Sequence, residues 1–215
     1  TVTLGLNNRT YTGSVSSNSV SITIEATKLQ ELVDGTTYTI TADVSDVAGN
    51  AATQSSTTFT YDKSAPSISS ITPSWGSHLN ATEDNSSGTI TVATSGVEDG
   101  QTVTVGLNGT NYTGSVSSNS VTITISATNL QALSEGTNTI TANVSDAAGN
   151  AASQSSTTFT YDKTSPSITS ITPSWGSHLN ATEDNSSGTV TVVTSGIEDG
   201  QTVTVGLNGT NYTGS

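Results

Sequence analysis

Polar and apolar residues alternate through most of the chain, in short runs that end at turn-forming residues. Alternation with a period of two predicts β-strands that bury one face. Within residues 66–165 the pattern predicts seven strands, at residues 68–73, 89–94, 102–107, 112–116, 121–125, 139–145 and 157–161. Leu130 and Leu133 have helical spacing instead, so we expect a single helical turn between residues 127 and 136.

The same sequence returns after about 100 residues. Residues 75–115 and 175–215 differ only by three exchanges among small apolar residues: Ile90/Val190, Ala93/Val193 and Val97/Ile197. A period of this length fits a whole domain rather than a solenoid coil. We therefore predict the C-terminal part of one domain at residues 1–65, a complete domain at 66–165 and the N-terminal part of a third at 166–215. Residue 1 falls within a strand pattern, so we expect the sequence to be part of a longer protein.

Seven short strands without a long helix, in about 100 residues, are the pattern of an immunoglobulin-like β-sandwich. Repetition of this pattern predicts an all-β chain of such sandwiches arranged end to end. The chain has no cysteine, so the disulfide of antibody domains is absent and we expect a core of aliphatic side chains. Trp75 lies near the first strand, and we expect it to pack against the end of the domain.

The charge of the chain narrows its possible partners. It carries 17 acidic and 4 basic residues, for a formal net charge of -13. Such a chain should be repelled by nucleic acid and by anionic membrane surfaces, and should attract divalent cations. No run of residues is apolar enough to span a membrane, and no signal peptide is present. Without cysteine, thiolate metal sites are excluded.

Several motifs follow one another in a fixed order through the complete domain. They are residues 79–83 (Leu-Asn-Ala-Thr-Glu), 97–105 (Val-Glu-Asp-Gly-Gln-Thr-Val-Thr-Val), 130–136 (Leu-Gln-Ala-Leu-Ser-Glu-Gly), 144–150 (Val-Ser-Asp-Ala-Ala-Gly-Asn) and 161–163 (Tyr-Asp-Lys) before Pro166. In these motifs the chain resembles the bacterial immunoglobulin-like repeats of giant biofilm-associated and RTX-type adhesins. It departs from many relatives at residues 118–120 (Ser-Asn-Ser), where they have a Gly-Thr-Trp type of strand start. The resemblance implies a secreted extender region at the bacterial cell surface, stiffened by Ca²⁺ at domain junctions and projecting a terminal adhesive domain.

The acidic residues offer candidate ligands for that cation. In an immunoglobulin-like sandwich, the second-to-third and sixth-to-seventh loops lie at the end where the chain enters, which we name the incoming end. The chain leaves at the opposite, outgoing end. At the joint near Pro66 this order brings together Asp62 of the first domain with Glu98, Asp99, Asp146 and Asn150 of the second. Calcium prefers six to eight oxygen ligands in flexible geometry, and extracellular modules bind it at roughly 0.1–1 mM.

Other acids extend this candidate set. The second joint should use Asp162, Glu198 and Asp199, and Asp46 repeats Asp146 in the first domain. Glu83 and Asp84 are further candidates, and the alternative position for them is the outgoing end. The simpler interpretations stay open: residues 146–150 can be an ordinary hairpin loop in which Asp146 binds its own backbone, and residues 98–100 a solvated turn.

No pattern in the chain favours catalysis. His78 and His178 each stand alone in a polar segment, and no catalytic triad, carboxylate pair or phosphate-binding loop is present. We expect Lys63 and Lys163 to pair with the acids of the joints rather than to form isopeptide bonds.

Two other functions stay open beside the spacer. Threonine-rich strand faces could bind a glycan or ice, although threonine is also a common choice for the solvated face of a strand. The chain could also be a subunit of a self-assembling filament or sheath, in which one copy completes the partial domain of another. The expected partners are thus the neighbouring repeats and, in the second case, further copies of the chain.

Overall fold

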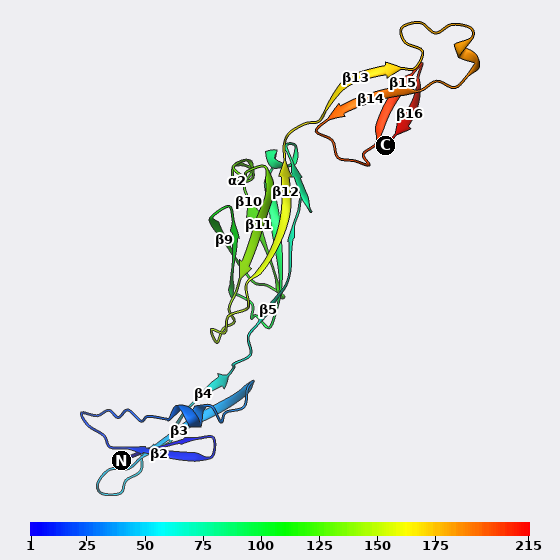
Figure 1. Cartoon of the computed structure of the whole chain (residues 1–215). Coiled ribbons are helices and arrows are strands. Elements are labelled where there is room, and N and C mark those ends of the chain that lie inside the picture. Colours follow the sequence, from blue (N-terminus) through cyan, green and yellow to red (C-terminus); the bar gives the residue numbers. More distant parts are fainter. The chain divides into compact units, whose positions relative to one another are not determined.

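The computed structural model describes residues 1–215, and nearly all of its regular structure is β-strand (Figure 1). The central repeat contains all seven predicted strands and the predicted helical turn. Its elements are β5 (Ser67–Pro73), β6 (His78–Asn80), the 3₁₀ turn η1 (Glu83–Asn85), β7 (Gly88–Ser95), β8 (Thr102–Leu107), β9 (Thr110–Ser115), β10 (Ser120–Ile125), α2 (Ala127–Gln131), β11 (Gly136–Asn143) and β12 (Ser155–Asp162).

The central strands form two sheets, with the orders β10-β7-β5 and β6-β12-β11-β8-β9. Alternate residues of β7, β8, β10, β11 and β12 face the core, as the pattern predicts. Val103 and Val105 of β8 are fully buried, and Ile140 and Ala142 of β11 are fully buried as well. The helical turn α2 lies at the end where β12 finishes (Figure 1), and its Leu130 is 1% exposed. The predicted all-β sandwich is confirmed.

Residues 75–85, which lie between the first two predicted strands, contain regular structure of their own. Leu79 is 1% exposed because the three residues of β6 pair in parallel with β12, with Leu79 opposite Tyr161. A strand this short shows no alternation, so the sequence pattern could not indicate it.

The expectation of a purely aliphatic core was wrong. The ring of Trp75 packs edge-on against Phe159, with 5.3 Å between ring centroids, and Tyr161 is 1% exposed. Trp75 also lies so close to Gly88 that a Cβ added there would stand 2.6 Å from the indole ring. Aromatic side chains therefore fill space in the core beside the aliphatic ones.

The first part of the chain forms a four-stranded sheet in the order β2-β1-β3-β4. Its elements are β1 (Val2–Leu6), β2 (Arg9–Gly13), the helical turn α1 (Ala26–Leu29), β3 (Thr36–Val44) and β4 (Ser55–Tyr61). Residues 20–24 repeat the sequence pattern of β10 but form no strand. In the central repeat β10 pairs with β7, and residues 1–65 contain no counterpart of β7.

The third part contains β13 (Ser167–Pro173), η2 (Glu183–Asn185), β14 (Val190–Ser195), β15 (Val203–Leu207) and β16 (Thr210–Gly214). Its hairpin β15–β16 has the same register as β8–β9: Val205 lies opposite Tyr212, as Val105 lies opposite Tyr112. The turn of this hairpin in the central repeat uses Asn108 and Gly109, both with positive φ (49° and 73°). This is the geometry that an Asn-Gly pair favours in a two-residue hairpin loop.

By internal contacts the chain divides into two units, and the division runs through the central repeat. One unit holds residues 1–74, 89–125 and 139–158, and the other holds residues 75–88, 126–138 and 159–215. The contacts discussed below each lie within one of these units. None of the helical segments is long and apolar enough to cross a membrane.

Candidate functional site

The loop at residues 146–150 is closed by the carboxylate of Asp146. Its Oδ1 accepts a hydrogen bond from the backbone N–H of Asn150 at 2.8 Å, and its Oδ2 accepts one from Asn150 Nδ2 at 2.9 Å. The backbone N–H of Asp146 donates to the carbonyl of Asn150 at 3.0 Å. This is the ordinary hairpin role considered above, so the loop is held together by its own residues.

The first repeat contains the same loop at residues 46–50. Asp46 accepts hydrogen bonds from the backbone N–H and the side-chain amide of Asn50 at 2.8 Å and 2.7 Å. The closure is therefore a property of the five-residue sequence and does not depend on the joint. The surroundings differ, because Asp146 is 3% exposed and Asp46 is open to solvent.

Both loop carboxylates stay ionised at neutral pH. Burial alone would raise the pKa of Asp146, but hydrogen bonds from the side chain and backbone of Asn150 and from nearby backbone N–H groups lower it below its ordinary value. The side-chain and backbone hydrogen bonds from Asn50 lower the pKa of Asp46 in the same way. Each loop therefore presents a fixed negative charge.

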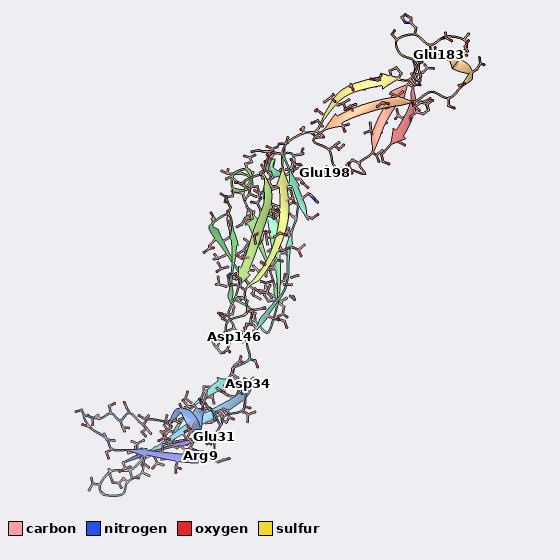
Figure 2. The ribbon with its side chains drawn as sticks, viewed as in Figure 1. Arg9, Glu31, Asp34, Asp146, Glu183 and Glu198 are labelled. Carbon is pink, nitrogen blue, oxygen red and sulfur yellow. The ribbon has the colours of Figure 1, made fainter.

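Two further contacts connect this loop to its neighbours at the joint. Asn150 Nδ2 also donates to the backbone carbonyl of Asp62, at 3.2 Å, so a single amide group bridges that carbonyl and the carboxylate of Asp146. The backbone N–H of Ala147 donates to Glu98 Oε2 at 2.9 Å. Figure 2 shows Asp146 at the end of the central repeat where β5 begins. The structure thus brings Asp62, Glu98, Asp146 and Asn150 together through one connected set of hydrogen bonds.

Two predicted ligands at this joint engage other groups. The carboxylate of Asp99 accepts a hydrogen bond from the backbone N–H of Ser118 at 2.7 Å, which connects the turn after β7 to the turn before β10. The carboxylate of Asp62 accepts one from the backbone N–H of Ser64 at 3.0 Å, within the linker itself. At this joint Asp62 therefore presents its carbonyl, and not its side chain, to Asn150.

The second joint repeats part of this arrangement. Asp162 Oδ1 accepts a hydrogen bond from the backbone N–H of Thr164 at 2.9 Å, as Asp62 does from Ser64. Glu198 and Asp199 are exposed in the turn after β14. Figure 2 shows Glu183 and Glu198 at opposite ends of the third repeat, which separates the acids of the incoming and outgoing ends.

Glu83 and Asp84 lie at the outgoing end. Glu83 Oε2 accepts a hydrogen bond from the backbone N–H of Asn80 at 3.1 Å. Asp84 is 5% exposed, and its Oδ2 accepts a hydrogen bond of 2.6 Å from the hydroxyl of Tyr161 in β12. The structure therefore gives Asp84 a partner inside the core of its own repeat.

Two acids that sequence reasoning missed contact the linkers. Asp34 Oδ1 accepts a hydrogen bond from the backbone N–H of Lys63 at 2.7 Å, and Glu135 Oε1 accepts one from the backbone N–H of Lys163 at 3.2 Å. Each acid precedes a glycine, Gly35 or Gly136, just before a strand. This acid-glycine pair at equivalent positions of two repeats was the signal that could have identified them.

The joint offers only oxygen ligands, as a hard cation prefers. No group of three or more acidic or histidine side chains converges closely enough to hold a metal ion. The oxygens that do converge are the carboxylate of Asp146 and the carbonyl of Asp62, which both accept from Asn150. Glu98 contacts the same loop through the hydrogen bond that it accepts from the backbone N–H of Ala147. The chemistry of these groups fits Ca²⁺, with water needed for the remaining positions.

Comparison with known proteins places the chain in a family. A family model described as a bacterial Ig-like domain matches residues 75–163, and one described as a bacterial Ig-like domain of group 3 matches residues 123–211. A comparison with curated protein sequences finds no match.

Several solved structures of bacterial adhesins are similar to the chain. One is from a study of host cell surface retention of a 1.5-MDa bacterial ice-binding adhesin, with 25% identity, a TM-score of 0.48, and coverage of 99% of this chain and 70% of that one. Another is a Ca²⁺-stabilized adhesin that helps an Antarctic bacterium to reach out and bind ice, with 27% identity, a TM-score of 0.43, and coverage of 99% of this chain and 53% of that one. A third is a bacterial immunoglobulin-like domain from the M. primoryensis ice-binding adhesin, with 25% identity, a TM-score of 0.35, and coverage of 45% of this chain and 99% of that one. Over residues 75–211, the two family matches and the repeated all-β fold show bacterial Ig-like domains in tandem, which form a non-catalytic structural family.

Proposed function

We propose that the chain is a series of spacer repeats in a bacterial cell-surface adhesin, and that Ca²⁺ stiffens its joints. The observation that carries the proposal is the bridge from the Asp62 carbonyl through Asn150 to the Asp146 carboxylate, because it connects successive repeats through oxygen-bearing groups. Near-identity of the repeats supports a mechanical role, since a spacer gains length from each added domain. An extracellular location at the cell surface is part of the same proposal.

The charges at the joint explain why a cation would help. Asp62, Glu98 and Asp146 are acidic, and Lys63 is the basic residue of the linker. A bound Ca²⁺ would supply positive charge and shared coordination, which lowers the repulsion between the carboxylates. Asp146 and Glu98 would hold it from the central repeat, and Asp62 from the first. Asn150 would position the Asp62 carbonyl and the Asp146 carboxylate for the ion through the hydrogen bonds that its amide donates to them.

Small-angle scattering of the chain in millimolar Ca²⁺ and in chelator tests this proposal. We expect a narrower distribution of long interatomic distances in Ca²⁺, with the β signal of circular dichroism unchanged. Asn150→Ala should weaken the response to Ca²⁺. Asn50→Ala is the matched control, because Asn50 closes the same kind of loop without a contact to a linker. Identical scattering and identical unfolding with and without Ca²⁺ would overturn the metal-dependent part of the proposal.

A further inference from the structure

The linkers between repeats are short, and carboxylates accept hydrogen bonds from their backbone N–H groups. In the first linker, Lys63 N–H donates to Asp34 and Ser64 N–H donates to Asp62. Pro66 ends the linker and has no N–H to donate. Lys63 and Ser64 are exposed, and their N–H groups donate to acids rather than to a neighbouring strand.

Asp34 makes a two-point contact with the first linker. One carboxylate oxygen accepts from Lys63 N–H at 2.7 Å, and the other accepts from the hydroxyl of Ser64 at 2.5 Å. The adjacent Gly35 donates its N–H to the carbonyl of Tyr61 at 2.8 Å. Together these bonds hold residues 61–64 against the loop that precedes β3.

Glu135 repeats this contact at the second linker with a longer side chain. Its Oε1 accepts from Lys163 N–H at 3.2 Å and from the hydroxyl of Thr164 at 3.0 Å. The acid is glutamate instead of aspartate and the hydroxyl belongs to threonine instead of serine, yet the same two linker groups, a backbone N–H and the next hydroxyl, donate to the carboxylate. Recurrence with different side chains argues against a chance contact between exposed groups.

The other end of each linker is fixed by proline. Pro66 is buried, and a Cβ added to Gly96 would lie 3.6 Å from its Cα. Pro166 lies against Gly196 in the same way, at 3.7 Å. Both glycines have a φ of 72°, a conformation that other residues rarely adopt, so the turn that receives the proline depends on glycine. A single residue, Ala65 or Ser165, thus separates the carboxylate-bound segment from the proline.

We propose that Asp34 and Glu135 are positioning residues that lock each linker onto the repeat it leaves, so that part of the stiffness of the joint needs no cation. The importance of this lock for the whole protein rests on the proposed spacer function. The lock itself is a separate claim about contacts within the chain. In this proposal two contacts orient the joint. The acid holds the linker to the outgoing end of one repeat, and the proline holds it to the incoming end of the next.

Amide hydrogen exchange measured by NMR on the full chain in chelator tests the lock without Ca²⁺. Asp34→Ala should speed exchange at Lys63 by roughly three- to tenfold, since a hydrogen bond to a charged acceptor is lost. Exchange at Lys163, held by the unchanged Glu135, is the reference within the same molecule. Asp43→Ala is the matched control, because Asp43 is an acid of the same repeat whose carboxylate binds Gln54 instead.

Two more variants separate positioning from folding. Asp34→Glu should restore slow exchange at Lys63, because glutamate makes this contact at the second linker. Ser64→Ala removes only the hydroxyl partner and should give a smaller acceleration. Amides between β3 and β4 should exchange at wild-type rates in every variant, which shows that the first repeat stays folded.

Residual dipolar couplings measure the orientation of one repeat relative to the next, which would not change if the Asp34 contact had only a local effect. In chelator, the residues before Pro66 and those after it should fit one alignment tensor in the wild-type chain and fit it less well in Asp34→Ala. Unchanged exchange at Lys63 in Asp34→Ala would overturn the lock. Faster exchange with unchanged couplings would overturn its role in orientation. A missing response to Ca²⁺ would instead count only against the proposed metal site.

Discussion

The hydroxyl of Tyr161 donates a 2.6 Å hydrogen bond to the carboxylate of Asp84, and both residues are buried. The bond joins β12, the last strand of the central repeat, to the 3₁₀ turn η1, which follows β6. Gln131 of α2 donates to Asn85 in the same turn, at 3.2 Å. The outgoing end of the repeat is therefore fixed by polar contacts just before the linker begins.

Replacing Tyr161 by phenylalanine should destabilise the central repeat by about 1–3 kcal/mol, because the buried acceptor Asp84 would lose its partner. Tyr61→Phe is the matched control, since residues 1–65 contain no counterpart of Asp84. Urea unfolding followed by the fluorescence of Trp75, in a Trp175→Phe background, measures the difference. Equal stability of the two variants would show that the bond contributes little.

The same pair predicts a dependence on alkaline pH. The hydrogen bond to Asp84, together with burial, raises the pKa of Tyr161 to about 12. A phenol whose pKa is raised in the folded state contributes stability that is complete below the unfolded value, near 10, and is lost as the pH rises towards the folded value. We expect the central repeat to lose stability between about pH 10 and 12, and Tyr161→Phe to remove that loss. Ultraviolet titration should show one late tyrosine in the wild-type chain.

Gly88→Ala tests the packing of Trp75. The added methyl carbon would lie 2.6 Å from the indole ring, so the ring or the strand must move. We expect a loss of about 1–3 kcal/mol, as for other overpacked cores. Gly214→Ala is the control, because a Cβ there meets no atom within 4 Å. A shifted fluorescence spectrum of Trp75 without loss of stability would mean that the ring adapts.

Acid should weaken the hydrogen bonds that close the two hairpin loops, at residues 46–50 and 146–150. Only the second loop also contacts a linker, through Asn150 and the carbonyl of Asp62. The pKa values of Asp46 and Asp146 are lowered by their hydrogen bonds, so each contribution is present above the ordinary aspartate value and is lost as the pH falls through the lower folded value. Below about pH 4 we expect faster amide exchange at Asn50 and Asn150. Asp146→Asn should reproduce the change at neutral pH for Asn150 alone.

The sequence predicted most of the central strands because apolar residues alternate along them, as in β8 with Val103 and Val105. It did not predict β6, where a single apolar residue, Leu79, faces the core. The loops of the incoming end were correctly grouped because strand order fixes which loops are neighbours, and the contact between Ala147 and Glu98 bears this out.

The direction of individual side chains was beyond sequence reasoning. Asp62 and Asp99 were predicted to direct their carboxylates to a cation at the joint, but these carboxylates accept hydrogen bonds from backbone N–H groups. Asp34 and Glu135 escaped notice because an acid before a glycine at the end of a loop also fits a solvated turn. Such choices depend on distances of a few ångströms, which residue types and spacing do not set.

The shared register of β8–β9 and β15–β16 has a consequence for how the protein is made. Two neighbouring hairpins with one sequence present equivalent edges, so each can pair with strands that belong to the other. Exchange of matching segments between adjacent domains is a known route to misassembly in repeat proteins. Synthesis from the N-terminus reduces this risk, because one domain can fold before the next repeat, with the same sequence, leaves the ribosome.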